Sequence, residues 1–215
     1  LALARVAESR SEFQTAKDLY QRVLESPGSK RFRREALLGL AESAASLDES
    51  EAALDAYGKL ADSLKDTSIS SPVNPSMAAA SMIARFRTRL EAGDAQTALR
   101  YASLADSLFP VGRSPADVQL GLGESNRKLA EEAVAEATGG NTNVSIADLD
   151  PTTKKRARDL YLAAANAFRT HASAVAGQNG PAYGDSLWIA ADCFDRAGDQ
   201  DRAVSLFTQF ADEFP

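Results

Sequence analysis

The sequence has little of what metal centres and nucleophilic enzymes require. Its 215 residues include one cysteine and one histidine. A single cysteine, Cys193, excludes an internal disulfide and any site built from several cysteines. Because catalysis needs several convergent groups, we expect no catalytic residue, no metal and no cofactor. His171 is expected to be a surface side chain or a hydrogen-bonded one, and Cys193 a small buried apolar residue.

Long apolar runs and an excess of positive charge are also absent. No stretch of 18 apolar residues occurs, so we expect no segment that spans a membrane. The 24 basic residues stand against 30 acidic ones, and the formal net charge of −6 argues against a nucleic-acid binder. Valine and isoleucine are scarce beside alanine and leucine, which favours helix over sheet.

The informative feature that the sequence does contain is internal similarity. Residues 91–110 read EAGDAQTALRYASLADSLFP, and residues 196–215 read RAGDQDRAVSLFTQFADEFP. Each has a Gly-Asp pair, an alanine four residues after the aspartate, and Phe-Pro eleven residues after that alanine. This match predicts a structural repeat. Since the sequence stops on Pro215 at the end of such a unit, we expect it to be a piece of a longer array.

The same alanine marks five units along the chain. Four of these alanines are followed, one helical turn later, by an aromatic residue: Tyr20, Tyr57, Tyr161 or Phe207. Further apolar residues precede each alanine at spacings of three and four, which define one face of a helix. We therefore predict helix–turn–helix units in which a small residue lets two helices approach and an aromatic ring fills the gap, with Tyr57 and Phe207 buried. The five anchor alanines are Ala16, Ala53, Ala98, Ala157 and Ala203.

The pattern resembles the tetratricopeptide repeat. The fifth unit matches best, with Phe194, Gly198, Asp199, Ala203, Phe207 and Pro215 at family positions. The resemblance implies an all-α, right-handed superhelical array of about five hairpins in a single domain, 1–215. The hairpins are expected at about 1–28, 32–66, 76–110, 115–176 and 182–215. Longer helices are expected in the fourth, bounded by a stop signal at Gly139-Gly140 and a start signal at Asp150-Pro151.

The resemblance further implies a non-catalytic scaffold that binds a peptide or helix of a protein partner. Tetratricopeptide-like arrays hold such ligands in the groove lined by the first helix of each hairpin. The fourth hairpin cannot be assigned, because its helices are longer. The other groove positions follow from counting back from each anchor alanine: Arg5 and Glu8, then Leu38, Glu42 and Ala45, then Ile83, Arg87 and Leu90, and finally Trp188, Asp192 and Asp195. Trp188 could instead pack within its own hairpin.

Two alternatives concern the setting of the array. The run GLGES at 121–125 is similar to the Glu-Ser pair of lytic transglycosylases, with Glu124 as the matching residue, so the chain could be a helical accessory domain of a larger peptidoglycan-active enzyme. We expect Glu124 to be a solvent-facing side chain, with glycines that allow close helix contact. The tails ADSLFP and FADEFP resemble those of bacterial envelope tetratricopeptide proteins, which favours the periplasm or envelope over the cytoplasm.

The last expectation concerns the second helix of the final hairpin. Its outer side carries Val204 and Phe210, and it is not polar enough to cap an array. We therefore expect the chain to self-associate through its C-terminal hairpin.

Overall fold

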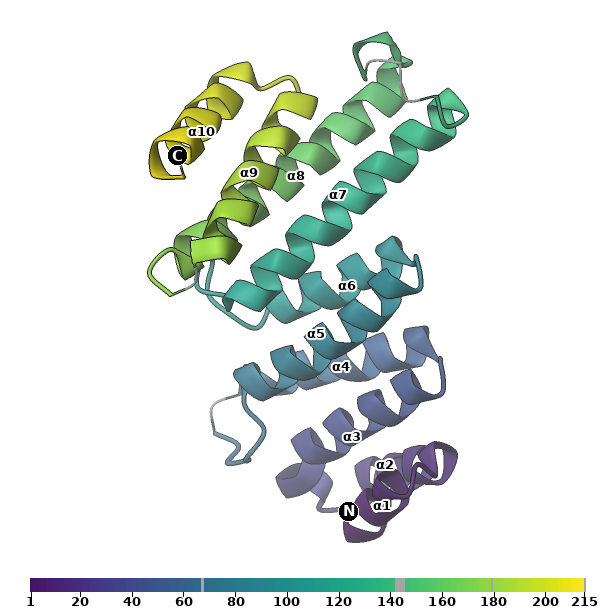
Figure 1. The fold of residues 1–215 in the computed structure, drawn as a ribbon. Helices are drawn as coiled ribbons and strands as arrows, with labels where there is room; N and C mark the ends of the chain where they lie inside the picture. Colours follow the sequence, from purple (N-terminus) through teal and green to yellow (C-terminus); the bar gives the residue numbers. More distant parts are fainter. Residues whose placement is uncertain (67, 142–145, 179, 215) are drawn as a thin grey trace. The chain divides into compact units, whose positions relative to one another are not determined.

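The fold is all-α, and no strand occurs among the residues that the structure describes. The structure is a computed structural model that describes residues 1–66, 68–141, 146–178 and 180–214; Pro215 lies outside these ranges. Helices form five consecutive pairs, as predicted (Figure 1). They are α1 (Ala2–Ser9), α2 (Phe13–Glu25), α3 (Arg33–Ser46), α4 (Ser50–Leu64), α5 (Pro75–Glu91), α6 (Ala95–Asp106), α7 (Ala116–Thr138), α8 (Pro151–Val175), α9 (Gly180–Arg196) and α10 (Gln200–Glu213), with short 3-10 helices η1 (Ser29–Phe32) and η2 (Ile146–Asp148).

The chain divides into two compact units. The first unit comprises Leu1–Thr88 with Arg100–Val111, and the second comprises Arg89–Leu99 with Gly112–Pro215. The boundary runs through α5 and α6, so each of these helices contributes to both units. The single domain that the sequence suggests stays a prediction.

The repeated Gly-Asp pair is explained by the turn between paired helices. Gly93 and Gly198 have φ of +81° and +76°, a left-handed conformation that glycine adopts at little cost. The next residue caps the following helix. Asp94 accepts a hydrogen bond from the Thr97 backbone N–H at 3.0 Å, and Asp199 accepts one from that of Arg202 at 3.4 Å.

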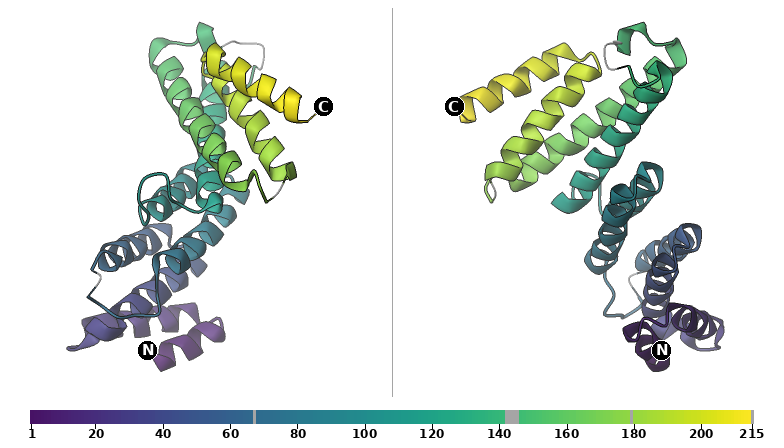
Figure 2. Two further views of the ribbon diagram at one scale, coloured as in Figure 1. Left: turned by 90° about the vertical axis from the view of Figure 1, so that its left-hand side faces the viewer. Right: turned by 45° about the vertical axis from the view of Figure 1, so that its right-hand side comes forward.

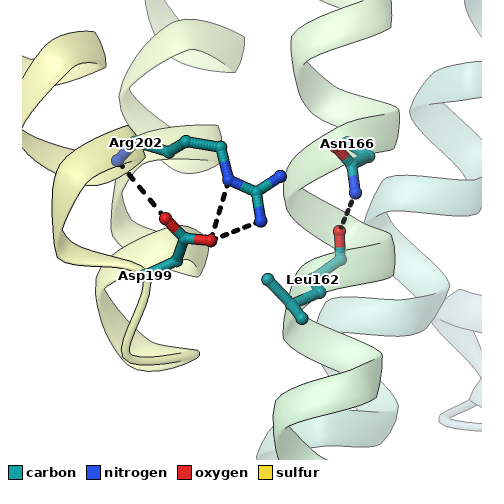
Figure 3. A network of polar contacts seen from close by, with 4 residues as sticks. All are labelled: Leu162, Asn166, Asp199 and Arg202. Carbon is teal, nitrogen blue, oxygen red and sulfur yellow. Dashed lines mark hydrogen bonds and ion pairs between the residues drawn. The ribbon is translucent and has the colours of Figure 1, made fainter.

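Asp199 also binds the side chain of the residue whose backbone it caps. Its Oδ2 accepts a hydrogen bond from Arg202 Nε at 2.8 Å (Figure 3). The guanidinium of Arg202 lies 4.3 Å from the centre of the Phe194 ring in α9. This contact links the start of α10 to Phe194, which lies near the end of α9.

The fourth pair is longer than the others, as predicted. Helix α7 has 23 residues and α8 has 25, and the two further views show them side by side (Figure 2). Helix α7 ends before Gly139, which has φ of +59°, and α8 begins after Asp150, whose Oδ1 accepts from the backbone N–H of Thr152 and Thr153. A Cβ at Gly123 would lie 2.9 Å from the Phe168 ring, so this glycine lets α8 approach α7 closely, as the glycine run predicts.

The anchor alanines locate the core. Each is fully buried or nearly so, which confirms the repeat alignment of the sequence. The aromatic residue one turn later is also buried in three units, at Tyr20, Tyr57 and Tyr161. The third unit has an alanine at this position, and Tyr101, one residue earlier, is buried and meets Tyr57 edge to face.

The prediction that Phe207 is buried was wrong. Phe207 is only partly buried, although it follows Ala203 as Tyr57 follows Ala53. The difference lies in the neighbouring hairpin. The Tyr20 ring packs so closely on α3 that a Cβ at Gly39 would lie 2.2 Å from it, and the Tyr57 hydroxyl reaches Ser81 of α5 at 2.7 Å. No described hairpin covers Phe207 in this way.

Candidate functional site

In the first unit, the first helices bring several of the predicted groove residues together. Arg5 and Glu8 lie on α1, and the Glu8 carboxylate accepts a hydrogen bond of 2.7 Å from Tyr20 Oη. Glu42 of α3 accepts one of 2.6 Å from Ser81 Oγ of α5. These first-helix side chains therefore take part in polar contacts rather than standing alone in solvent.

The electrostatic setting of Glu42 reflects this position. Burial raises the pKa of the Glu42 carboxyl, and the nearby Glu8 carboxylate adds to the rise, while the hydrogen bond from Ser81 and the charge of Arg85 act in the opposite direction. The carboxyl groups of Glu8 and Glu42 and the guanidinium of Arg85 therefore interact electrostatically, although they lie on three helices, α1, α3 and α5. These side chains of α1, α3 and α5 are charged, and hydrogen bonds from Tyr20 and Ser81 already satisfy part of their hydrogen-bonding capacity.

The remaining predicted groove residues of this unit differ in their solvent exposure. Arg5 and Arg87 are exposed, Leu38 and Ala45 are half-buried, and Ile83 is buried. Ile83 is therefore part of the core of α5 rather than a residue that a ligand could reach.

In the second unit, one concave feature lies between α7 and α9. A cavity of about 440 Å³ opens between these two first helices, with α8 as its floor. Phe168 and His171 of α8 form the floor, and charged side chains stand on both walls. Leu90, one of the predicted groove residues, also lines it. The walls comprise Leu120, Glu124, Arg127, Lys128 and Glu131 of α7 and Ala182, Asp185, Ser186 and Ile189 of α9.

A second cavity, also of about 440 Å³, lies further along the same two helices. It shares Glu131 with the first, and its floor is Tyr161, again on α8. Asp195 and Arg196 of α9 line it, together with Val134 and Ala135 of α7. We call the two cavities together the α7–α9 cleft. Charged side chains line its walls, and the aromatic rings of Phe168 and Tyr161 beneath it are almost fully buried.

The three predicted groove residues of α9 take different places. Asp195 lines the α7–α9 cleft, as just described, and accepts a hydrogen bond from Gln200. Asp192 pairs with Arg196 at 2.8 Å. Trp188 packs edge to face on Phe207 and Phe210 of α10, with ring centres 4.9 and 5.2 Å apart, yet it remains 51% exposed. Trp188 therefore packs within its own hairpin, the alternative left open by the sequence.

Glu124 was expected to face solvent, with glycines beside it that allow close helix contact. Glu124 is half-buried and lines the α7–α9 cleft beside the floor residue His171. His171 is itself buried, and its Nδ1 lies 2.7 Å from Ser186 Oγ of α9. Because Ser186 is buried too, this pair joins two helices and offers no accessible nucleophile. Cys193 is fully buried as expected, and burial raises the pKa of its thiol to about 12, so it is inert.

Most of the cleft residues that sequence reasoning missed belong to the unassigned fourth hairpin, and the others lie on α9: Ala182, Asp185, Ser186, Ile189 and Arg196. Phe168, Arg127, Lys128 and Glu131 line the cleft, and none was among the predicted groove positions. The signal that could have located them was Gly123. A glycine inside a long helical pattern predicts close approach of a second helix, and here it admits the Phe168 ring.

The buried His171 makes the stability of this unit depend on pH. Burial lowers the pKa of the imidazole, while the charge of Asp117 opposes the shift. A histidine with a lowered pKa in the folded state stabilises the fold above its unfolded pKa of about 6.5, and this contribution is lost as the pH falls toward the folded value. We expect the free energy of unfolding, measured by urea titration, to fall between about pH 7.5 and 5.5.

The control for this pH prediction is His171→Asn, which keeps a polar side chain opposite Ser186 but does not titrate. It should show a smaller fall over the same pH interval. Equal pH slopes in the two proteins would show that His171 is not the source of the dependence.

The described residues contain neither a group of three potential metal-binding side chains nor a helix that is long and apolar enough to cross a membrane.

Comparison with known proteins adds a family match to the repeat architecture. The tetratricopeptide repeat family matches residues 185–215, which cover most of α9 and all of α10. Two crystal structures of the nearly identical TPR-like repeats of a putative kinesin light chain from Podosopora anserina, one of them a form with a single substitution, are 14% identical to the chain. They cover 99% of it and 91% and 92% of their own chains, each with a TM-score of 0.45. No curated protein matches the chain. The family match confirms the resemblance to the tetratricopeptide repeat for the C-terminal hairpin, residues 185–215.

Proposed function

We propose that this chain is a non-catalytic scaffold that binds a peptide segment of a protein partner along its first helices. The observation that carries the proposal is the α7–α9 cleft. It lies between two first helices, where the stacking of hairpins leaves side chains uncovered, and it combines an aromatic floor with charged walls. An extended peptide that places an apolar side chain against the half-buried Ile189 and polar groups toward Lys128 and Asp185 fits this chemistry.

The test uses cavity filling. Ala182 lines the cleft and Ala211 is an exposed residue of α10, so Ala182→Trp and Ala211→Trp form a matched pair. Peptides selected from a random displayed library on the 215-residue chain should bind at least about tenfold more weakly to Ala182→Trp, a loss of about 1.4 kcal/mol. Ala211→Trp should bind them unchanged. Peptides that bind both variants alike would place the ligand elsewhere.

The finer parts of the proposal concern setting and assembly. We propose a role in the bacterial cell envelope, which the likeness of the hairpin tails to envelope tetratricopeptide proteins supports. We also propose that the chain self-associates through its C-terminal hairpin, where Val204 is 61% exposed and Phe207 and Phe210 are only partly buried.

A further inference from the structure

The second helices of the array line a groove of their own, apart from the α7–α9 cleft. A cavity of about 590 Å³ lies between α6 and α8, and α7 contributes one residue to its lining. All of its lining residues belong to the second compact unit, and none of them lines the α7–α9 cleft. We call this cavity the α6–α8 groove. It is large enough to take side chains of a bound peptide.

Leucines from three helices make part of the groove apolar. Leu99 of α6 and Leu160 of α8 are half-buried, and Leu129 of α7 is almost fully buried. Leu99 and Leu160 therefore leave part of their apolar surface open to solvent. An apolar side chain that entered the groove would remove this surface from water, which is favourable.

One side of α8 forms a charged wall of the groove. The lining residues of α8 follow one another at spacings of three and four, which place them on one side of the helix. They include Lys155, Arg156 and a single acid, Asp159. Lys155 and Arg156 are exposed, and neither makes a hydrogen bond or an ion pair with another described residue. Both cations are thus available to a ligand in the groove.

Contacts within the protein do not account for these two cations. Elsewhere in the same unit, Arg127, Arg196 and Arg202 each pair with a carboxylate three or four residues away. Helix α8 carries five lysines and arginines against one acid, in a chain whose net charge is −6. Four of the five lie in its first eight residues, near the end of the helix where the dipole gives a positive charge no stabilisation. The stability of α8 therefore does not explain them either.

We propose that the α6–α8 groove is a second binding site, and that it receives an acidic segment of a protein partner. An apolar side chain of this segment lies between Leu99 and Leu160, and carboxylates beside it meet Lys155 and Arg156. The two sites share no lining residue, so this proposal does not rest on the one made for the α7–α9 cleft.

A protein segment fits this groove better than a nucleic acid does. Both bring negative charge to Lys155 and Arg156, but a phosphate backbone has no apolar side chain to cover the leucines. Asp159 on the same wall repels phosphate, whereas its carboxylate can accept a hydrogen bond from a peptide N–H. The net charge of −6 also opposes the approach of a long polyanion.

The test begins with peptides selected from a random displayed library on the Ala182→Trp variant, in which the α7–α9 cleft is filled. The selected peptides should carry an apolar residue flanked by aspartate or glutamate. Their affinities for the 215-residue chain and its variants are then measured by fluorescence anisotropy. Lys155→Glu should weaken their binding at least about tenfold. A glutamate near the start of α8 suits the helix dipole, so this variant should remain folded.

Arg169→Glu is the matched control for Lys155→Glu. Arg169 is exposed and lies on α8 outside the groove, and its substitution changes the charge by the same amount. It should leave the affinity unchanged. Leu99→Gln tests the apolar contact and should weaken binding at least about fivefold, with circular dichroism to confirm that the helices are intact.

A labelled single-stranded DNA oligonucleotide is the second probe. Binding of the oligonucleotide but of no acidic peptide would overturn the proposal, by showing that the wall of α8 is a phosphate-binding surface. Equal affinities of the peptides for Lys155→Glu and Arg169→Glu would overturn it too, as would a selection that yields no acidic peptide. None of these results bears on the α7–α9 cleft, whose ligands are recognised by their loss of affinity for Ala182→Trp.

Discussion

Replacing Tyr57 with alanine is expected to lower the free energy of unfolding by about 3–5 kcal/mol. The side chain is fully buried, its ring meets Tyr101 edge to face with centres 6.0 Å apart, and its hydroxyl lies 2.7 Å from Ser81 Oγ. The substitution removes the packing of an aromatic ring between α4, α5 and α6 and leaves a cavity that these helices fill only in part. Urea denaturation followed by circular dichroism measures the loss.

Phe207→Ala is the matched comparison, because Phe207 occupies the same repeat position in α10. Its ring is only partly buried, so its removal should cost about 1–2 kcal/mol, below the loss expected for a fully enclosed aromatic side chain. The sequence alone predicted that both rings are buried, which implies similar losses at the two sites. Equal measured losses would contradict the account in which the following hairpin, rather than the partner helix, provides most of the burial.

Replacing Arg34 with alanine is the second change with a large expected effect, a loss of about 2–4 kcal/mol. Arg34 lies on α3 and is almost fully buried. Its guanidinium donates hydrogen bonds to the backbone carbonyls of Ser63 at 2.6 Å, Asp66 at 2.5 Å and Ile69 at 2.9 Å. The last carbonyls of a helix have no partner within the helix, and here a charged fork supplies one for the end of α4 and the segment after it.

Arg33→Ala is the control for this arginine, because the neighbouring Arg33 is exposed. Its loss should stay within about 0.5 kcal/mol, as for most surface substitutions. Arg34→Lys should recover only part of the stability, since one ammonium group cannot reproduce the planar fork of the guanidinium. Thermal and urea unfolding of the three variants give their free energies of unfolding, which should fall in the order Arg33→Ala, Arg34→Lys, Arg34→Ala. Equal stability of Arg33→Ala and Arg34→Ala would contradict this prediction. It would show that water replaces the guanidinium as hydrogen-bond donor to the three carbonyls with no loss of stability.

Local signals in the sequence predicted much of the fold. The anchor alanines are buried because close helix contact requires a small residue at a fixed place, and this requirement is visible in the spacing alone. The ends of the long helices could also be predicted from the sequence. Asp150 caps α8 with its side chain, and Gly139 adopts the left-handed conformation that ends α7. Phe207 could not be judged in this way, because its burial depends on a neighbouring hairpin.

The candidate site was less accessible to sequence reasoning. Counting from an anchor works where hairpins share one length, and it placed Asp195 on the α7–α9 cleft and Glu42 among the polar contacts of the first unit. The fourth hairpin breaks that count. The floor residue Phe168 belongs to a second helix, a position that the groove rule does not consider. It lines the cleft from below and is itself almost fully buried.

The long α7–α8 hairpin has a consequence for how the chain exchanges its amide hydrogens and loses structure on heating. Its helices are about twice the length of α6, so amides in the middle of α7 and α8 lie several turns from any fraying end. In helix α1, which has only 8 residues, almost every amide lies close to a helix end. Amides near the end of a helix open more readily than amides in its middle. The slowest-exchanging amides therefore belong to α7 and α8, beneath the cleft, and the proposed peptide site rests on the segment that opens last.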